Sequence, residues 1–190
     1  MGLDWHSGFI CDTMFGKLAR WMRFCGLDTL YPDTMDDSSL AQMAIQTKRI
    51  LITRDKQFKF RKNLCAIVIG EEGVDKQFEK LCTELNIVIS VRDDSKDIEI
   101  NGKVLPARCP LCNSVLITIS AEEYRKGYSL AAQQDRPDDM SGNERVPEAV
   151  LSSGLAFYRC TGKGCSKFYW HGTHWDRIIK TLKSMTQKRG

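Results

Sequence analysis

Four of the eight cysteines in this 190-residue chain are arranged as two close pairs. Cys109 and Cys112 form a C-x-x-C pair, and Cys160 and Cys165 follow much later as a C-x-x-x-x-C pair. A tight turn with such spacing presents two thiolates to one ion, and a second turn completes a tetrahedron. Because four cysteine ligands leave no open coordination position, the spacing predicts a structural zinc site and not a catalytic one.

Two alternatives compete with this interpretation of the cysteines. The four residues could be unrelated core thiols or form two disulfides. Strand patterns at residues 115–119 and 157–159 flank the pairs, however, and this arrangement favours a zinc ribbon. His171 and His174 could replace one thiolate, although we expect both rings to pack at the edge of the ribbon instead.

Carboxylates form a second group of residues suited to metal binding. Asp12 and Asp55 each follow a short apolar or β-branched run, and Asp36 and Asp37 open a predicted helix. Clustered carboxylates repel one another unless a cation lies between them, and Mg²⁺ or Mn²⁺ prefers hard oxygen ligands. We therefore expect Asp12 and Asp55 to bind Mg²⁺ or Mn²⁺. Asp36 or Asp37 is either the third catalytic acid or a helix cap.

Basic and aromatic residues lie next to these acids in the sequence. Around Asp55, cationic side chains alternate with Phe58 and Phe60. Positive charge and aromatic rings beside an acidic pocket suit phosphate binding and base stacking, whereas the alternative is an ordinary solvated surface. The residues that we expect to bind RNA are Lys17, Arg20, Arg23, Arg54, Lys56 and Lys59.

The first half of the chain alternates between strand patterns and amphipathic helical patterns. Strands are expected at residues 9–11, 28–31, 49–53, 65–69 and 87–91. This alternation predicts βαβ units and a parallel sheet. In such sheets, functional groups gather beyond the carboxyl ends of the strands, where Asp12 and Asp55 both fall.

The chain divides into two predicted domains. We expect an α/β domain at residues 1–104 and a zinc ribbon at residues 105–190. The polar segment at 92–104 is either a linker or a hairpin around Asn101-Gly102. Residues 127–145 lack periodicity, which predicts a long inserted loop, and an amphipathic helix closes the chain.

Composition narrows the class of protein. At 42% hydrophobic and 27% charged residues, the sequence is typical of a globular chain. No apolar run approaches a membrane span, and the first residues have no signal-peptide pattern. We therefore expect no membrane partner and an intracellular, reducing location in the cytoplasm or nucleus. The net charge is +4, and its basic excess lies in the cysteine-bearing half, which favours contact with phosphates there.

Several segments resemble a known family. Residues 9–23 (FICDTMFGKLARWMR) are closely similar to the opening of the Mut-seven C-terminal RNase family, in which a PIN-like nuclease domain is usually fused to a zinc ribbon. The similarity continues, in the family's order, at residues 49–55 (RILITRD), 108–113 (RCPLCN) and 169–175 (YWHGTHW). The resemblance therefore spans nearly the whole chain.

This resemblance implies a fold and an activity. The fold is a PIN-like parallel-sheet sandwich followed by a small zinc ribbon, and the activity is metal-dependent RNA hydrolysis, with RNA as the partner, alone or in a ribonucleoprotein. In PIN nucleases the metal is held by acids like those matched here by Asp12, Asp36 or Asp37, and Asp55. The second cysteine pair is two residues longer than the family's C-x-x-C, a spacing that zinc tolerates.

Three other functions remain as alternatives. The same fold could serve as a non-catalytic RNA- or ribosome-binding factor, in which the acids are vestigial or structural. A protein-interaction module using the ribbon would predict no RNA affinity at all. A phospho-acceptor domain would use Asp12, but no acidic pair adjoins that residue in the sequence.

Overall fold

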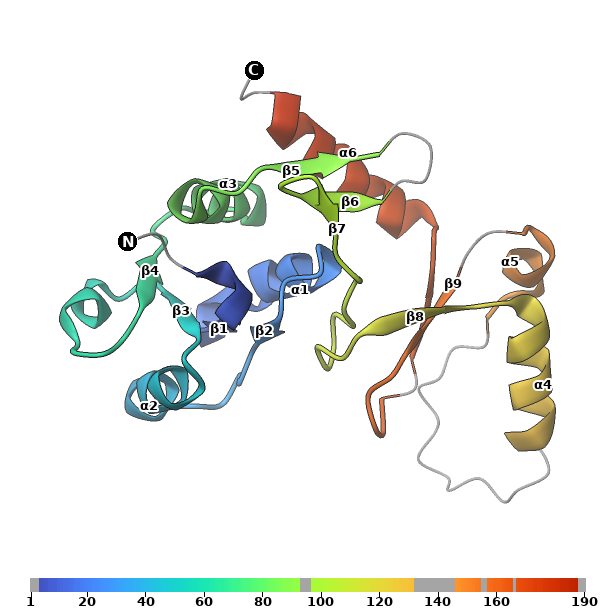
Figure 1. The fold of residues 1–190 in the computed structure, drawn as a ribbon, viewed down its shortest axis with the longest axis horizontal. Helices are drawn as coiled ribbons and strands as arrows, with labels where there is room; N and C mark the ends of the chain where they lie inside the picture. The colour runs from blue at the N-terminus through green and yellow to red at the C-terminus, as the bar shows by residue number, and fades with distance from the viewer. Residues whose placement is uncertain (1–3, 93–96, 132–145, 155–156, 166, 188–190) are drawn as a thin grey trace.

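A parallel sheet lies between helices in the first half of the chain. A computed structural model describes residues 4–92, 97–131, 146–154, 157–165 and 167–187 (Figure 1). The sheet has the order β2-β1-β3-β4, and its strands are β1 (Phe9–Cys11), β2 (Thr29–Leu30), β3 (Ile50–Thr53) and β4 (Ala66–Val68). All three pairings are parallel. The predicted α/β fold with a parallel sheet is therefore confirmed.

Helices cover both faces of this sheet. They are α1 (Gly16–Phe24), α2 (Asp37–Thr47) and α3 (Val74–Leu85). Successive side chains of a strand point to opposite faces. Accordingly, Ile50 and Ile52 pack in one core with α1 and α3, whereas Leu51 packs in a second core with α2. The strands are buried on both sides, as their continuous apolar sequence predicts.

Local sequence signals set the ends of two of these helices. Asp36 caps α2, because its Oδ1 accepts hydrogen bonds from the backbone amides of Ser38 and Ser39 at 2.9 and 3.0 Å. Gly26 follows α1 with a φ of +86°, which residues other than glycine rarely adopt. A Cβ at this position would lie 2.5 Å from Cβ of Leu105, so the backbone approach also requires glycine.

The fifth predicted strand belongs to a separate antiparallel sheet. In this sheet β5 (Ile89–Val91) pairs with β6 (Ile98–Ile100), which in turn pairs with β7 (Lys103–Val104). The β6–β7 turn is Asn101-Gly102, and both residues have positive φ, as a tight two-residue hairpin turn requires. This segment is therefore a hairpin and not a linker, and β5 does not extend the parallel sheet.

The cysteine-bearing part is built on a third sheet. Its antiparallel order is β10-β9-β8, with strands β8 (Leu116–Ile119), β9 (Phe157–Cys160) and β10 (Phe168–Trp170). Two helices accompany it, α4 (Ala121–Ala131) and α5 (Glu148–Ser152). Ser120 and Glu123 form a capping box at the start of α4, with reciprocal bonds of 3.1 and 2.7 Å. Residues 127–131, predicted as loop, are thus helical, and residues 132–145 lie outside the described part of the chain.

The last helix returns from the ribbon to the α/β part. Helix α6 (Thr173–Gln187) lies beside β5 (Figure 1). Its apolar stripe is buried in the same core as α1 and α3 and consists of Trp175, Ile178, Ile179 and Leu182. The last helix therefore shares the core of the α/β part, whereas the ribbon strands have buried clusters of their own. Within the described residues, no helix is both long and apolar enough to cross a lipid bilayer.

Candidate functional site

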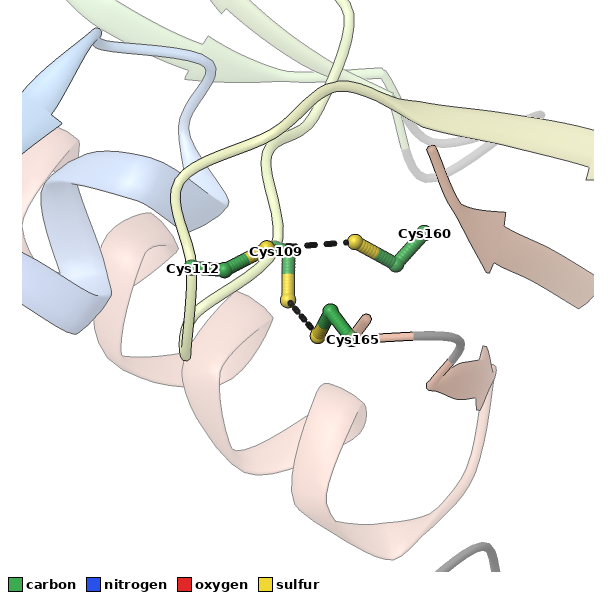
Figure 2. Close-up of side chains that lie close together, drawn as sticks. All are labelled: Cys109, Cys112, Cys160 and Cys165. Carbon is green, nitrogen blue, oxygen red and sulfur yellow. Dashed lines mark hydrogen bonds between the residues drawn. The ribbon is translucent and has the colours of Figure 1, made fainter. Parts of the chain in front are cut away.

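Four cysteine sulfurs converge between the β8–β9 sheet and α1. The Sγ atoms of Cys109, Cys112, Cys160 and Cys165 all lie within 4.8 Å of one another (Figure 2). Cys109 Sγ is 3.7 Å from Cys165 Sγ, and Cys112 Sγ is 3.3 Å from Cys160 Sγ. These separations are too long for disulfides, which need about 2.05 Å. They are close to the roughly 3.8 Å that tetrahedral Zn–S bonds of about 2.3 Å require, so the cluster can hold a zinc ion.

Backbone hydrogen bonds shape the two turns that carry these sulfurs. The first turn closes through Cys109 N to the carbonyl of Ser114 at 2.8 Å, with Asn113 at a φ of +69°. The second turn closes through Cys165 N to the carbonyl of Gly162 at 3.1 Å. Gly162 N also donates to Cys160 Sγ at 3.3 Å, as amides do in metal-thiolate turns. Hydrogen bonds within the protein therefore close both turns.

The thiols differ in acidity. Burial raises the pKa of Cys112, but hydrogen bonds from Ser114 and from the neighbouring thiols outweigh this and lower it to about 6. Burial raises the pKa of Cys160, and it raises that of Cys165 to about 11. Of these three thiols, Cys112 is thus the first to ionise. A thiolate is the form that binds metal, so zinc binding must displace protons from the others.

Two histidines, His171 and His174, lie near the second cysteine pair in the sequence. His171 Nε2 is 3.1 Å from the hydroxyl of Tyr158, and its ring stacks on Trp175 at 4.2 Å. The expected packing role of His171 is therefore confirmed. The side chain of His174 lies outside the described part of the structure.

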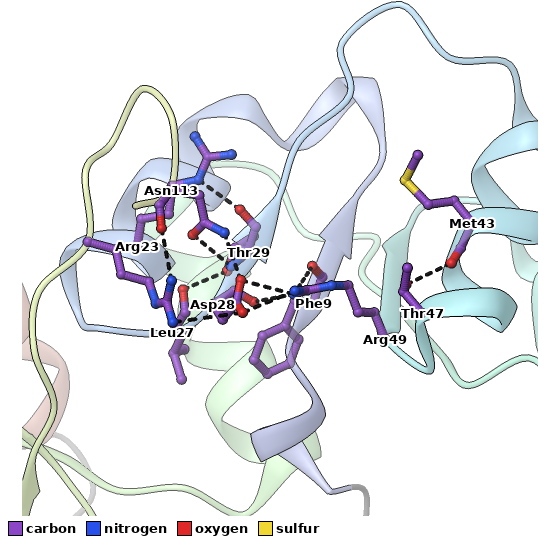
Figure 3. Close-up of polar contacts among 10 residues, drawn as sticks. Phe9, Arg23, Leu27, Asp28, Thr29, Met43, Thr47, Arg49 and Asn113 are labelled. Atoms are coloured by element: carbon purple, nitrogen blue, oxygen red, sulfur yellow. Dashed lines mark hydrogen bonds and ion pairs between the residues drawn. The ribbon is translucent and has the colours of Figure 1, made fainter. Parts of the chain in front are cut away.

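A polar network attaches the first cysteine turn to the parallel sheet (Figure 3). Asn113 donates to Asp28 Oδ1 at 2.7 Å and accepts from the backbone amide of Thr29 at 3.0 Å. Arg49 and Arg108 form ion pairs with the same Asp28 carboxylate at 3.0 and 3.8 Å. Burial raises the pKa of Asp28, but the bonds from Arg49 and Asn113 and the charge of Arg108 lower it overall.

Arg23 belongs to this attachment as well. Its side chain is only 5% exposed, and its guanidinium donates to the carbonyls of Thr29, Pro110 and Leu111 at 2.8 to 3.1 Å. A guanidinium committed to buried carbonyls does not reach a phosphate. Our expectation that Arg23 binds RNA is therefore corrected: it joins α1 to the cysteine turn.

Asp12 and Asp55 both bond to Thr53 at the carboxyl edge of the parallel sheet. The hydroxyl of Thr53, at the end of β3, donates to Asp12 Oδ2 at 3.1 Å and accepts from the backbone amide of Asp55 at 3.1 Å. Asp12 Oδ1 also accepts from the Thr13 hydroxyl at 3.0 Å. One fully buried threonine thus connects the two acids, at the edge where the sequence pattern placed them.

The two acids at the start of α2 have different roles. Asp36 accepts the two capping bonds and a third from the hydroxyl of Ser39 at 2.6 Å; this hydroxyl is the main reason that the pKa of Asp36 is lowered. Asp36 is therefore a helix cap, the second of the two roles that the sequence left open, and its catalytic role stays a prediction. Asp37 is exposed and faces a pocket that it shares with Asp55.

This pocket has a volume of about 420 Å³ and lies between α2 and η3 (Lys56–Phe60), a short 3₁₀ helix. Its lining consists of Asp37, Ser38, Asp55, Gln57, Phe58, Phe60 and Arg61. Asp55 caps η3 by accepting from the amide of Gln57 at 2.8 Å. The pocket thus joins carboxylates, aromatic rings and a guanidinium. Ser38 and Gln57 also line it, and the sequence pattern does not indicate them as site residues.

The remaining expected RNA-binding residues lie around this edge of the sheet. Lys17, Arg20, Lys56 and Lys59 are exposed, so their charges face solvent. Arg54 is half-buried and donates to the carbonyl of Glu71 at 3.4 Å, while its Nε has no partner. Within the described residues, the acids do not come together in a group of three, and the only such group of metal-binding side chains is the cysteine cluster.

A comparison with protein families shows which family the chain belongs to. Residues 7–182 match the Mut7-C RNAse domain, and the match covers nearly the whole chain. The chain belongs to the Mut7-C RNAse domain family. This confirms the family that the sequence segments indicated. A comparison with curated proteins finds no match. Membership of the Mut7-C RNAse domain family supports a nuclease role with RNA as substrate or partner.

Proposed function

We propose that this protein hydrolyses RNA phosphodiester bonds with Mg²⁺ or Mn²⁺ held by Asp12, Asp55 and Asp37. The observation that carries the proposal is the link through Thr53, whose hydroxyl bonds both the Asp12 carboxylate and the backbone amide of Asp55 at the edge of the sheet. Asp37 supports it, because it lines the same pocket as Asp55. Carboxylate oxygens at such an edge are the ligands that Mg²⁺ and Mn²⁺ prefer.

The residues of the chain would have three roles in this reaction: metal binding, orientation of the metal ligands and RNA binding. Asp12, Asp55 and Asp37 would hold the cation, which when bound supplies an acidified water and offsets phosphate charge. Thr53 would orient two of the acids. Lys17 and Arg20, on the helix that follows Asp12, are exposed and would bind the RNA backbone.

The zinc cluster has a structural role in this proposal. Four cysteines leave no position for a substrate or a water molecule on the ion. Arg23 and Asn113 hold the first cysteine turn against α1 and β2, so zinc would stabilise the edge of the sheet that neighbours β1. We further propose that the ribbon docks RNA across the acidic edge.

Cleavage of labelled single-stranded and hairpin RNA tests the proposal. The zinc-loaded protein would be incubated with Mg²⁺, with Mn²⁺, or with neither, and compared with Asp12→Asn and Asp55→Asn. We expect cleavage that requires the added ion and is lost in both variants. Asp33→Asn is a matched control, because Asp33 is an exposed acid away from the pocket lining. Equal cleavage by wild type and Asp12→Asn would refute the assignment.

A non-catalytic RNA-binding factor is the second candidate. Two observations favour it: both oxygens of Asp12 accept hydroxyl hydrogen bonds, and the acids of the described residues do not form a group of three. Under this function, the wild type would bind RNA tightly and cleave none with either ion. RNA affinity alone does not separate the two functions, because basic residues serve both.

A further inference from the structure

Phe60 is a large apolar side chain that is held in solvent. It is 88% exposed, which is the highest value among the large hydrophobic residues of the described structure. Two residues earlier in η3, Phe58 is only 6% exposed and packs in the core beneath α2. Asp55 caps the N-terminal end of the same short helix. The buried ring of Phe58 and the Asp55 cap fix the backbone of η3, and Phe60 projects from this fixed backbone into solvent.

The pocket beside Phe60 has the size and composition of a ligand site. Its volume of about 420 Å³ lies within the range of roughly 300–1,000 Å³ that is usual for small-ligand pockets. The rings of Phe58 and Phe60 supply apolar surface, and Asp37 and Asp55 supply carboxylates. The apolar part therefore adjoins the proposed metal-binding acids directly.

Positive charge surrounds this pocket. Arg61 lines it, and Lys56, Lys59 and Lys62 are exposed on the same segment. In the part of the chain that the structure describes, none of these four forms an ion pair with an acid, so their charges are free for a ligand. Cations bind backbone phosphates and an aromatic ring stacks on a base, so the combination fits a nucleic acid chain.

We propose that Phe60 stacks on one unpaired nucleobase and that the substrate of this site is single-stranded RNA. This inference rests on the proposed function, because Asp55 belongs both to the pocket and to the proposed metal site. A base inside a duplex is already stacked on both faces, so only an unpaired base can use the ring. Stacking on Phe60 tolerates every base, because each has a π-face.

Equilibrium binding measures this subsite without requiring cleavage. Labelled single-stranded RNA and the same strand in a duplex would be titrated with zinc-loaded protein, without Mg²⁺ or Mn²⁺, and followed by fluorescence anisotropy. We expect Phe60→Ala and Phe60→Leu to weaken single-strand binding by roughly 5- to 150-fold. Phe60→Trp should retain the affinity, because it keeps an aromatic face. Duplex binding should be unchanged in all three variants.

A matched control and a direct optical readout complete the experiment. Val88→Ala truncates another exposed apolar side chain, 61% exposed, and should leave RNA binding unchanged. In Phe60→Trp, the added tryptophan should be quenched by single-stranded RNA and not by the duplex. Single-strand affinity of Phe60→Ala within twofold of wild type would overturn the subsite, and so would the absence of single-strand binding by wild type.

The subsite and the nuclease can fail independently. If the wild type cleaves RNA with Mg²⁺ or Mn²⁺ but Phe60→Ala binds and cleaves normally, the nuclease proposal is supported and the Phe60 subsite is refuted. If Phe60→Ala loses single-strand affinity while the wild type cleaves nothing with either ion, the subsite stands on a non-catalytic RNA-binding protein.

Discussion

Asn113 donates a hydrogen bond of 2.7 Å to the carboxylate of Asp28, and so connects a residue of the first cysteine turn with the residue that precedes β2. The same amide group accepts from Thr29 N, within β2 (Figure 3). Strand β2 is the edge strand beside β1, which ends next to Asp12. The cysteine turn is therefore a structural part of the α/β fold and not a detached module.

Removing the Asn113 side chain should destabilise the whole fold. Asn113→Gly keeps a residue that tolerates the φ of +69°, so the change removes the hydrogen bonds without adding backbone strain. The buried amide of Thr29 would lose its partner, and we expect a loss of about 2 kcal/mol in the free energy of unfolding. Urea denaturation of the zinc-loaded protein measures this value.

Asn63→Gly is the matched control for this substitution. Asn63 is exposed, has a φ of +63°, and makes no side-chain hydrogen bond with the described residues. Its replacement should therefore leave the unfolding free energy unchanged or slightly higher. Equal stability of the Asn113 and Asn63 variants would show that the Asn113 contacts contribute nothing.

Asp28 should make stability dependent on acid pH. Its folded-state pKa is lowered from the ordinary 3.8, mainly because the bonds from Arg49 and Asn113 outweigh burial. The unfolded chain then binds the proton more tightly than the folded one. The carboxylate therefore stabilises the fold fully above pH 3.8, and this contribution is lost as pH falls through the lower folded-state value. Wild type should exceed Asp28→Asn in stability at pH 6, and this difference should shrink towards pH 3; a constant difference would contradict the assignment.

The sequence predicted the elements whose causes are local. The parallel strands are continuous apolar runs, Asn101-Gly102 is a hairpin turn by its own backbone preference, and the spacing of cysteines 109 and 112 is that of a metal turn. Asp12 and Asp55 were located because a parallel strand directs the residue after it to the carboxyl edge. These inferences require only the near neighbours of each residue.

The features that the sequence did not predict depend on contacts between distant segments. The sequence pattern indicates a phosphate-binding role for Arg23, because it does not reveal that the distant carbonyls of Pro110 and Leu111 accept hydrogen bonds from this side chain. The packing of α6 in the core with α1 and α3 also depends on distant segments. An apolar stripe in the sequence predicts that a helix is buried, but it does not identify the surface that the helix packs against. The helix α4 is different, because its capping box at Ser120 and Glu123 is a local signal that indicates a helix start in the sequence itself.

Asp36 and Asp37 should separate stability from activity. Asp36→Ala removes the α2 cap and should lower the free energy of unfolding, with metal-dependent cleavage retained by the folded protein. Asp37→Asn removes a pocket carboxylate and should reduce cleavage with little change in stability. Both variants would be measured by urea denaturation and by RNA cleavage at saturating Mn²⁺. The reverse pattern would show that Asp36, and not Asp37, binds the catalytic ion.

Gly162→Ala should weaken zinc binding. A Cβ there would lie 2.8 Å from Cys112 Sγ and 3.3 Å from Cys160 Sγ, so two ligands would have to move. Overpacking of about 1–3 kcal/mol corresponds to a roughly 5- to 150-fold loss of affinity, which competition with a chromophoric chelator measures. Gly70→Ala is the control, because its Cβ would meet nothing within 4 Å. If both variants bind zinc as the wild type does, the cysteine geometry described above is wrong.

Thr53→Val should impair catalysis without disrupting the fold. Valine matches threonine in shape and suits a strand, but it lacks the hydroxyl that donates to Asp12 and accepts from the amide of Asp55. Groups that orient metal ligands typically contribute 10- to 100-fold to metal affinity or activity. We therefore expect the Mn²⁺ concentration for half-maximal cleavage to rise by roughly that factor, and kcat to fall less. Thr118→Val, at an exposed position of β8, should change neither quantity. An unchanged Mn²⁺ requirement in Thr53→Val would mean that the two acids hold their positions without this threonine.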